Sequence, residues 1–297
     1  MALLDGMAER DPLYKPGFGN RVFLLSLMGK GEEARVFLDG IEPYLPGDPN
    51  IEASRAWIDF QQGKAADGVR RMESSLEKQP TDRAYKVGVN HGNYRTHQYE
   101  RVFDDHFSRF IVLALFNLDR IEEANIVAQE KAANGVVAPL FAFLNASDQS
   151  ELLVDYFEDR WPNLEAFQQE VPAFIFGYGQ MADIALAYQR TGNEARFNQA
   201  MELLDAANLQ SLSQGIVSND LLILLAAQHA MAGDTEQALT RLAEAIDGGL
   251  ITSAKISREY PHFRGLDGNP RYEAIQARMI EHLNRERAQL GLEPISG

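Results

Sequence analysis

The sequence predicts an all-α fold, and the prediction rests on a regular interval near its start. Pro12, Pro46 and Pro80 stand 34 residues apart, and Gly29 and Gly63 keep the same interval. A self-similarity of this length is typical of two-helix solenoid repeats, because one helical hairpin cannot bury its apolar face without a neighbour. We therefore expect helical hairpins stacked side by side along the chain.

Each residue type at this interval has a physical role in a hairpin. The glycine falls where the first helix must turn, since glycine carries no Cβ. Ala34 and Gly68 follow it by five positions and let the second helix pack closely on the first. The proline ends the second helix because it lacks a backbone N–H. This pattern resembles the tetratricopeptide repeat family, which implies a right-handed superhelical solenoid whose first helices line a concave groove.

The pattern divides one solenoid over 1–297 into four parts. Regular repeats are expected over about 1–81 and 178–250, an irregular centre over 82–177, and a C-terminal cap over 252–297. Apolar periodicity and turn residues predict helical pairs in each part. The expected helices include 15–28 with 31–44, 50–62 with 65–78, 138–146 with 150–160, and a hairpin over 221–247.

The irregular centre begins where the interval fails, between Asp82 and Gln98. Gly88, Gly92 and a polar run predict a shortened helix, a loop, or both. A strongly apolar helix is expected over 107–118. Further along, residues 209–217 are expected to form a longer connection before the last hairpin.

A capping helix is predicted after Gly268. Tyr272, Ile275, Met279 and Leu283 recur at intervals of three and four, so they share one helix face, and the opposite face is polar. The end of a solenoid needs such a cover. The final residues resemble the C-termini of repeat regions attached to bacterial class III adenylate cyclases and winged-helix regulators. The resemblance implies a regulatory region of a larger bacterial signalling protein, with more chain upstream.

Composition limits the classes of partner and compartment. The net charge is −15, there is no cysteine, and no run of eighteen apolar residues occurs. These features predict a cytoplasmic protein without a membrane partner. An acidic surface repels phosphate backbones, so no nucleic-acid partner is expected and a protein or peptide with basic residues is favoured. The oligomeric state does not follow from the sequence.

The sequence contains no motif that predicts catalysis. It lacks a phosphate-binding loop, an HExxH motif and a GxSxG elbow. His91, His97 and His106 are close in the sequence, but their spacing does not place them on one helix face. We therefore expect no enzyme activity, no cofactor and no metal site.

The leading functional prediction is a scaffold that binds a peptide or a protein domain in its concave groove. Trp57 and Phe60 are three residues apart on one face, and large aromatic side chains often anchor interfaces. Two alternatives stay open for this pair, groove or core. The residues predicted to line the groove are Phe23, Leu27, Asn50, Trp57, Phe60, Gln61, Ile223, Ala227 and Met231.

The alternative prediction is a ligand-sensing regulatory module. In that case the irregular centre would close over a small molecule, since loops with aromatic and histidine side chains often carry function in solenoids. The residues predicted to line this pocket are Tyr94, His97, Phe174 and Tyr178.

Overall fold

The computed structural model describes residues 15–102, 110–171 and 175–296, and these residues form helices without any strand. The prediction of an all-α helical-repeat fold is confirmed. Most helices form antiparallel pairs in which we distinguish a first and a second helix. The pairs are α2 (Lys15–Leu27) with α3 (Gly31–Ile41), α4 (Pro49–Gln61) with α5 (Ala65–Lys78), α7 (Phe110–Asn117) with α8 (Ile121–Ala133), α9 (Ala138–Ala146) with α10 (Ser150–Arg160), α12 (Ile175–Arg190) with α13 (Glu194–Ser213), and α14 (Asn219–Met231) with α15 (Thr235–Asp247).

The remaining elements join or cover these pairs. Helix α6 (Arg83–Arg95) is followed by the short 3₁₀ helix η2 (Tyr99–Arg101), and η1 (Glu42–Tyr44) continues α3. Helix α11 (Leu164–Glu170) precedes α12. After α15 come α16 (Ile256–Glu259), η3 (Pro261–Leu266) and the long α17 (Pro270–Gln289). No helix among the described residues is long and apolar enough to cross a membrane.

Short polar side chains set the starts of many helices. Asp48 accepts a hydrogen bond from the Asn50 backbone N–H at 2.9 Å, and Asp82 accepts one from Ala84 at 2.8 Å. Asn269 caps α17 in the same way. Such side chains satisfy backbone donors that have no partner inside the helix. The helix starts are therefore encoded locally.

The stretch from Asp82 to Gln98 is more regular than the sequence predicts, because α6 is a continuous helix. A Cβ on Gly92 would lie 2.4 Å from a Val69 methyl and 3.2 Å from the Phe60 ring. The glycine therefore makes room for α5 and α4 rather than breaking the helix. The expected connection over 209–217 is also partly helical, since α13 continues to residue 213.

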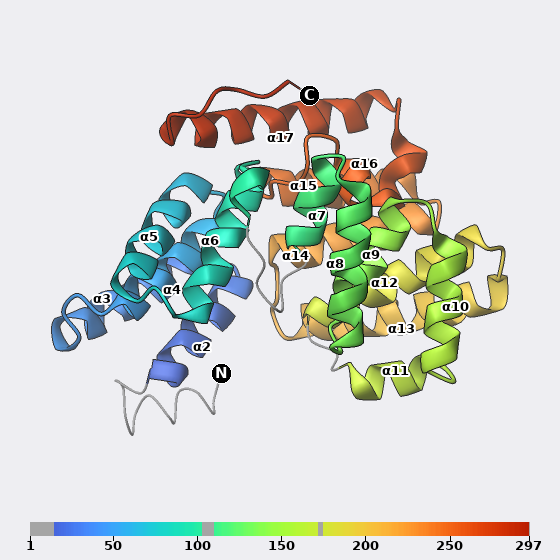
Figure 1. Cartoon of the computed structure of the whole chain (residues 1–297), viewed down its shortest axis with the longest axis horizontal. Coiled ribbons are helices and arrows are strands. Elements are labelled where there is room, and N and C mark those ends of the chain that lie inside the picture. Colours follow the sequence, from blue (N-terminus) through green and yellow to red (C-terminus); the bar gives the residue numbers. More distant parts are fainter. Residues whose placement is uncertain (1–14, 103–109, 172–174, 297) are drawn as a thin grey trace.

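The predicted cap is present and reaches further than expected. Tyr272, Ile275 and Met279 are buried in one cluster with side chains of α14, α15 and η3. Leu283 is buried against Ala65 at the start of α5. Figure 1 shows α17 lying along one side of the molecule, over α5 and α6 at one end and toward α15 at the other. The helix therefore covers both the last hairpin and the N-terminal hairpins.

The chain also closes on itself, because the last hairpin contacts the first. Leu27 of α2 is buried with Ile216, Leu221 and Leu225. The Val217 backbone N–H donates to the Leu27 carbonyl oxygen at 2.9 Å. The contact joins residues almost two hundred positions apart, so the apolar ends of α2 and α14 shield each other from water.

We predict that Gly92→Ala destabilises the fold although alanine is the better helix former. The added methyl overlaps Val69 and Phe60, both held by packing, so the loss should be about 1–3 kcal/mol. Urea unfolding followed by circular dichroism measures it. An unchanged or higher midpoint would show that α5 and α6 do not pack as closely as described.

Candidate functional site

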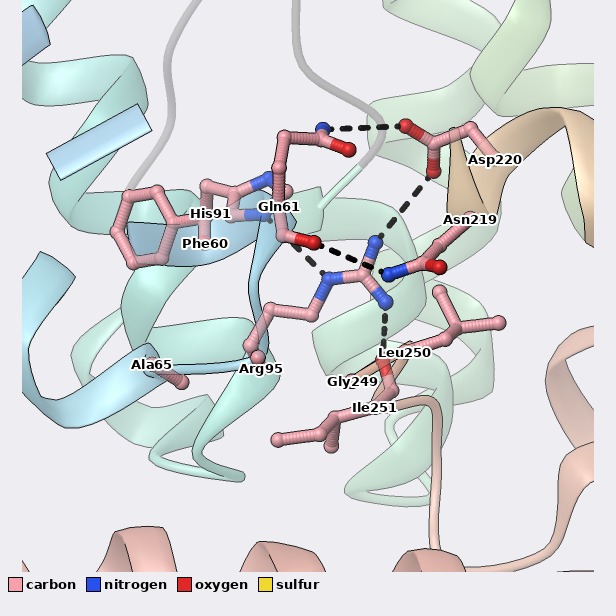
Figure 2. A pocket seen from close by; sticks show the side chains of 11 residues that line it. Phe60, Gln61, Ala65, His91, Arg95, Asn219, Asp220, Gly249, Leu250 and Ile251 are labelled. Carbon is pink, nitrogen blue, oxygen red and sulfur yellow. Dashed lines mark hydrogen bonds and ion pairs between the residues drawn. The ribbon is translucent and has the colours of Figure 1, made fainter. Parts of the chain in front are cut away.

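A pocket lies where residues 60–95 meet residues 219–251, and we call this contact the seam. Figure 2 shows side chains from the end of α4, from α6, from the start of α14 and from the segment after α15 converging on it. None of these segments is adjacent in sequence to the next. The lining residues used below are Phe60, Gln61, Gly63, His91, Arg95, Asn219, Asp220 and 249–251.

Arg95 makes most of the polar contacts in the seam. Its guanidinium donates to the Ile251 carbonyl oxygen and to His91 Nε2 at 3.4 Å, and lies 3.8 Å from the Asp220 carboxylate. Gln61 Nε2 donates to the same carboxylate at 3.5 Å. The opposite charges of Arg95 and Asp220 compensate each other, as partly buried charges require. These polar groups join α4 and α6 to the start of α14 and the segment after α15.

The cavity inside the seam is small. Its volume is ≈ 10 Å³, which is room for about one water molecule. Sites for small molecules usually measure about 300–1,000 Å³. The polar lining suits a bridging water, and the geometry gives no support to a small-molecule ligand here.

The backbone makes the closest contact of the seam, between Gly63 and Gly249. A Cβ on Gly249 would lie 2.4 Å from Gly63 Cα, and one on Gly63 would lie 2.5 Å from Gly249 Cα. Both residues have positive φ, 73° and 98°. A ring nitrogen of His282 donates to the Gly63 carbonyl oxygen at 2.8 Å, and Asn219 donates to the Gly248 carbonyl oxygen at 2.8 Å. Only glycine suits both positions, for space and for conformation.

The predicted groove pair has two different environments. Phe60 is 8% exposed, and a Cβ on Gly68 would lie 2.4 Å from its ring. It is a core residue, and the groove assignment does not hold for it. Trp57 is only partly buried, and its ring contacts Phe60 and His91 edge-on at centroid distances of 5.6 and 5.3 Å.

Most of the other predicted groove residues are also interior. Leu27, Ile223, Ala227 and Met231 are buried, which corrects their assignment to an open groove. The physical reasons differ: Leu27 is covered by the last hairpin, Ile223 and Ala227 pack against α15, η3 and α17, and Met231 packs in the cluster of the central helices. The predicted groove residues that keep partial exposure, besides Trp57, are Phe23, Asn50 and Gln61.

The predicted ligand pocket is not assembled by the described residues. Tyr94 is buried with its ring 5.5 Å from Tyr99 and 5.3 Å from Phe110. His97 stacks on Tyr99 at 5.0 Å. Neither lines the seam pocket. Phe174 and the side chain of Tyr178 lie outside the described part of the chain.

Two buried histidines lie where the C-terminal segment meets the rest of the protein. His97 Nε2 donates to the Thr252 carbonyl oxygen at 2.5 Å, and burial lowers its pKa to about 4. His262 of η3 has Nε2 3.8 Å from the Asp183 carboxylate. Burial lowers its pKa to about 4 as well, although the Ala182 backbone opposes the shift. Both rings are therefore neutral at pH 7, and sequence reasoning identified only His97.

The described residues contain no group of three or more His, Cys, Asp or Glu side chains that could hold a metal ion. Of the histidines considered from the sequence, His91 contacts aromatic rings and His97 the Thr252 carbonyl oxygen, and His106 lies outside the described residues. The arrangement shows ring packing and structural hydrogen bonds.

Comparisons with known proteins give a distant structural likeness. No protein-family model matches the sequence, and no curated protein matches it. One similar solved structure is described as a human IFIT1 dimer with PPP-AAAA; it is 15% identical, with a TM-score of 0.44 over 98% of this chain and 73% of that chain. A second, a human IFIT1 dimer with m7Gppp-AAAA, is 15% identical, with a TM-score of 0.43 over 95% and 69%.

The comparisons correct one expectation from the sequence. Net charge predicted that nucleic acid is not a partner, yet both similar structures hold a nucleic-acid ligand. Net charge describes the whole surface, whereas recognition depends on the charges at one site. The value of −15 therefore excludes no class of partner.

We predict that Gly249→Ala opens the seam. Its methyl would meet the Gly63 backbone, which cannot move aside as a side chain can, and alanine disfavours the positive φ. Hydrogen exchange should become faster at the end of α4 and the start of α14, with the α9–α12 core unchanged. Gly233→Ala is the matched control, since it has positive φ but open space around its Cβ. Equal effects of the two variants would contradict the contact.

We also predict that acidification destabilises the protein through His97 and His262. The unfolded histidines have a pKa near 6.5 and the folded ones about 4, so the unfolded state binds protons first. Stability present above pH 6.5 is lost as the pH falls toward 4. The difference between 6.5 and about 4 corresponds to about 3 kcal/mol per histidine at most.

Carboxylates also titrate in this range, so the variant His97→Gln isolates the histidine contribution. The glutamine amide can still donate to the Thr252 carbonyl oxygen but takes up no proton. Urea unfolding at pH 7 and pH 4.5 should show a smaller loss of stability in the variant than in the wild type. The same loss in both proteins would show that His97 titrates normally in the folded state.

Proposed function

We propose that the protein is a non-catalytic scaffold that binds a partner protein or peptide through the outer surfaces of its second helices. One observation carries the proposal. The most exposed large apolar side chains of the described residues lie on second helices or directly after them, and none lies on a first helix. They are Val36, Tyr44, Ile121, Ile126, Leu152, Leu209, Leu212 and Val217.

This distribution follows from the closure of the chain. The inner sides of the first helices pack against one another and against the seam, so their apolar residues contribute to the fold. Apolar side chains that stay in water contribute little to folding stability. Single exposed apolar residues are ordinary, but their restriction to one helix layer supports the proposal that this layer makes the contacts.

The proposal includes the absence of enzyme activity. The buried His97 donates to the Thr252 carbonyl oxygen, His262 Nε2 lies 3.8 Å from the Asp183 carboxylate, and the sequence contains no cysteine. The seam cavity has room for about one water. A scaffold needs neither a reactive group nor a ligand cavity.

The test compares two sets of four substitutions. Val36, Tyr44, Ile126 and Leu152 are changed to serine in one variant; Glu77, Lys78, Gln237 and Glu244, exposed polar residues of α5 and α15, are changed to serine in the control. Both variants should melt close to the wild type because all eight side chains are exposed. Each protein is immobilised as the full chain, and retained host proteins are quantified by mass spectrometry.

We expect the wild type and the control to retain at least one host protein in common. The amount of that protein retained by the first variant should be lower by about tenfold or more, which corresponds to about 1.4 kcal/mol. Exposed apolar anchors in an interface carry contributions of this size. Identical sets of retained proteins for all three baits would end the proposal.

A further inference from the structure

Helix α3 and the following η1 carry an exposed stripe that mixes apolar and small residues. Val36 is 71% exposed and Tyr44 is 70% exposed, the two largest values among the exposed apolar side chains. Gly40, also exposed, lies midway between them. Residues four apart lie on one side of an α-helix, so Val36 and Gly40 follow one line on α3, and Tyr44 lies just beyond the helix end in η1. Pro43 extends the stripe beside Tyr44. We call these four residues the α3 face.

Two other second helices provide an internal comparison. On α5 the exposed stripe carries Arg70, Ser74 and Glu77, and on α15 it carries Glu236 and Glu244 among other polar residues. All three helices bury one apolar side against their own hairpin. The solvated side of α3 therefore differs from those of α5 and α15.

Packing among the described residues does not require glycine at position 40. A Cβ at this position would meet nothing within 4 Å, and the residue does not have positive φ. By contrast, a Cβ on Gly68 would lie 2.4 Å from the Phe60 ring, and one on Gly92 would lie 2.4 Å from a Val69 methyl. Glycine in a helix costs up to about 1 kcal/mol relative to alanine. A glycine that the fold does not need leaves the backbone open to close approach from outside.

Charge distinguishes the two ends of the α3 face. Glu32 and Glu33 occupy the first turn of α3 with side chains 82% and 55% exposed. Their ion pairs with Arg35 and Lys30 are long, 3.7 and 3.4 Å, and lie at the surface. Asp39 is directed instead to Arg55 at 2.6 Å. The N-terminal end of the face therefore offers two solvated carboxylates whose ion pairs are long, whereas the carboxylates near the other end, Asp39 and Glu42, are closely paired with Arg55.

We propose that the α3 face docks an amphipathic helix of a partner protein, whose backbone crosses α3 at Gly40. Val36 and Tyr44 contact the apolar ridge of the partner helix on either side of the crossing. Lys or Arg residues at one end of the partner helix face Glu32 and Glu33. The proposal rests on the proposed scaffold function and assigns one contact surface and one class of partner to it.

Helix packing supplies the physical reason for the crossing point. Interaxial distances depend on the side chains at the contact, and they reach the short end of about 8–10 Å where a small residue lies at the crossing. Close approach brings Val36 and Tyr44 into contact with the partner together. A second copy of this chain is a poor occupant, because its own Glu32 and Glu33 would bring further negative charge to a protein of net charge −15.

The probe is a synthetic helix of about 20 residues with leucines every three or four positions, alanine at its centre and lysines along its flanks. A twin peptide carries glutamates in place of the lysines. Binding to the full chain is measured by fluorescence anisotropy, and the contact is located by hydrogen exchange over residues 31–44. The expected result is protection of this segment by the lysine peptide and little binding of the glutamate twin.

Gly40→Leu is the decisive variant, since its side chain enters open space in the free protein and holds the partner away. It should weaken binding by about tenfold or more, whereas Ser74→Leu, the same bulk on α5, should not. Gly40→Ala should raise the urea midpoint slightly, because the fold loses nothing and the helix gains. A lower midpoint for Gly40→Ala would show that the fold needs the glycine and would overturn the argument.

Other outcomes assign the face differently. The α3 face is overturned if the peptide protects other segments from hydrogen exchange and leaves α3 unchanged, or if Gly40→Leu binds the peptide as tightly as the wild type. The scaffold function is then decided by its own test with host proteins. Concentration-dependent dimers in sedimentation equilibrium that Gly40→Leu dissociates would assign the face to a second copy and overturn the partner class. If the peptide does not bind but host proteins are still retained, the proposal for this surface fails and the scaffold function does not.

Discussion

The close contact of Gly63 with Gly249 joins two distant parts of the chain. It allows the turn after α4 to meet the segment after α15 with no side chain between them. Around this point, Arg95 pairs with Asp220, and a ring nitrogen of His282 donates to the Gly63 carbonyl oxygen. The hydrophobic cluster of Leu27 with the last hairpin and the contact of α17 with α5 join the same two parts of the chain.

Closure changes which surfaces are free to bind. In an open solenoid the first helices present a concave face, where aromatic anchors for a binding partner are expected. Here Phe60 and Leu27 are buried, one in the space left by Gly68 and Gly92 and the other under the returning hairpin. Exposed apolar side chains remain on the second helices instead. The physical consequence is that, among the described residues, apolar side chains of the first helices are largely covered and the most exposed ones lie on the second helices or directly after them.

Buried polar groups give this architecture a dependence on pH as well as on packing. His97 and His262 are neutral when buried, and both belong to contacts that attach the segment after α15 to the rest of the protein. A neutral imidazole tolerates burial better than a charged one. The C-terminal segment is therefore the part whose attachment responds most directly to protonation.

The sequence by itself determined the helices, their pairing and the cap. These features are local: glycines at turns, short polar caps and apolar spacing of three and four act over a few residues. It could not determine that α6 is continuous, because glycines such as Gly88 and Gly92 disfavour a helix. Their presence is explained only by Met72 and Val69, which pack against them in the folded chain. Nor could it place Phe60 and Leu27, since their burial depends on contacts between distant segments. Tertiary structure decided the seam and the free surfaces, because the same apolar side chain serves equally as groove or core until its neighbours are fixed.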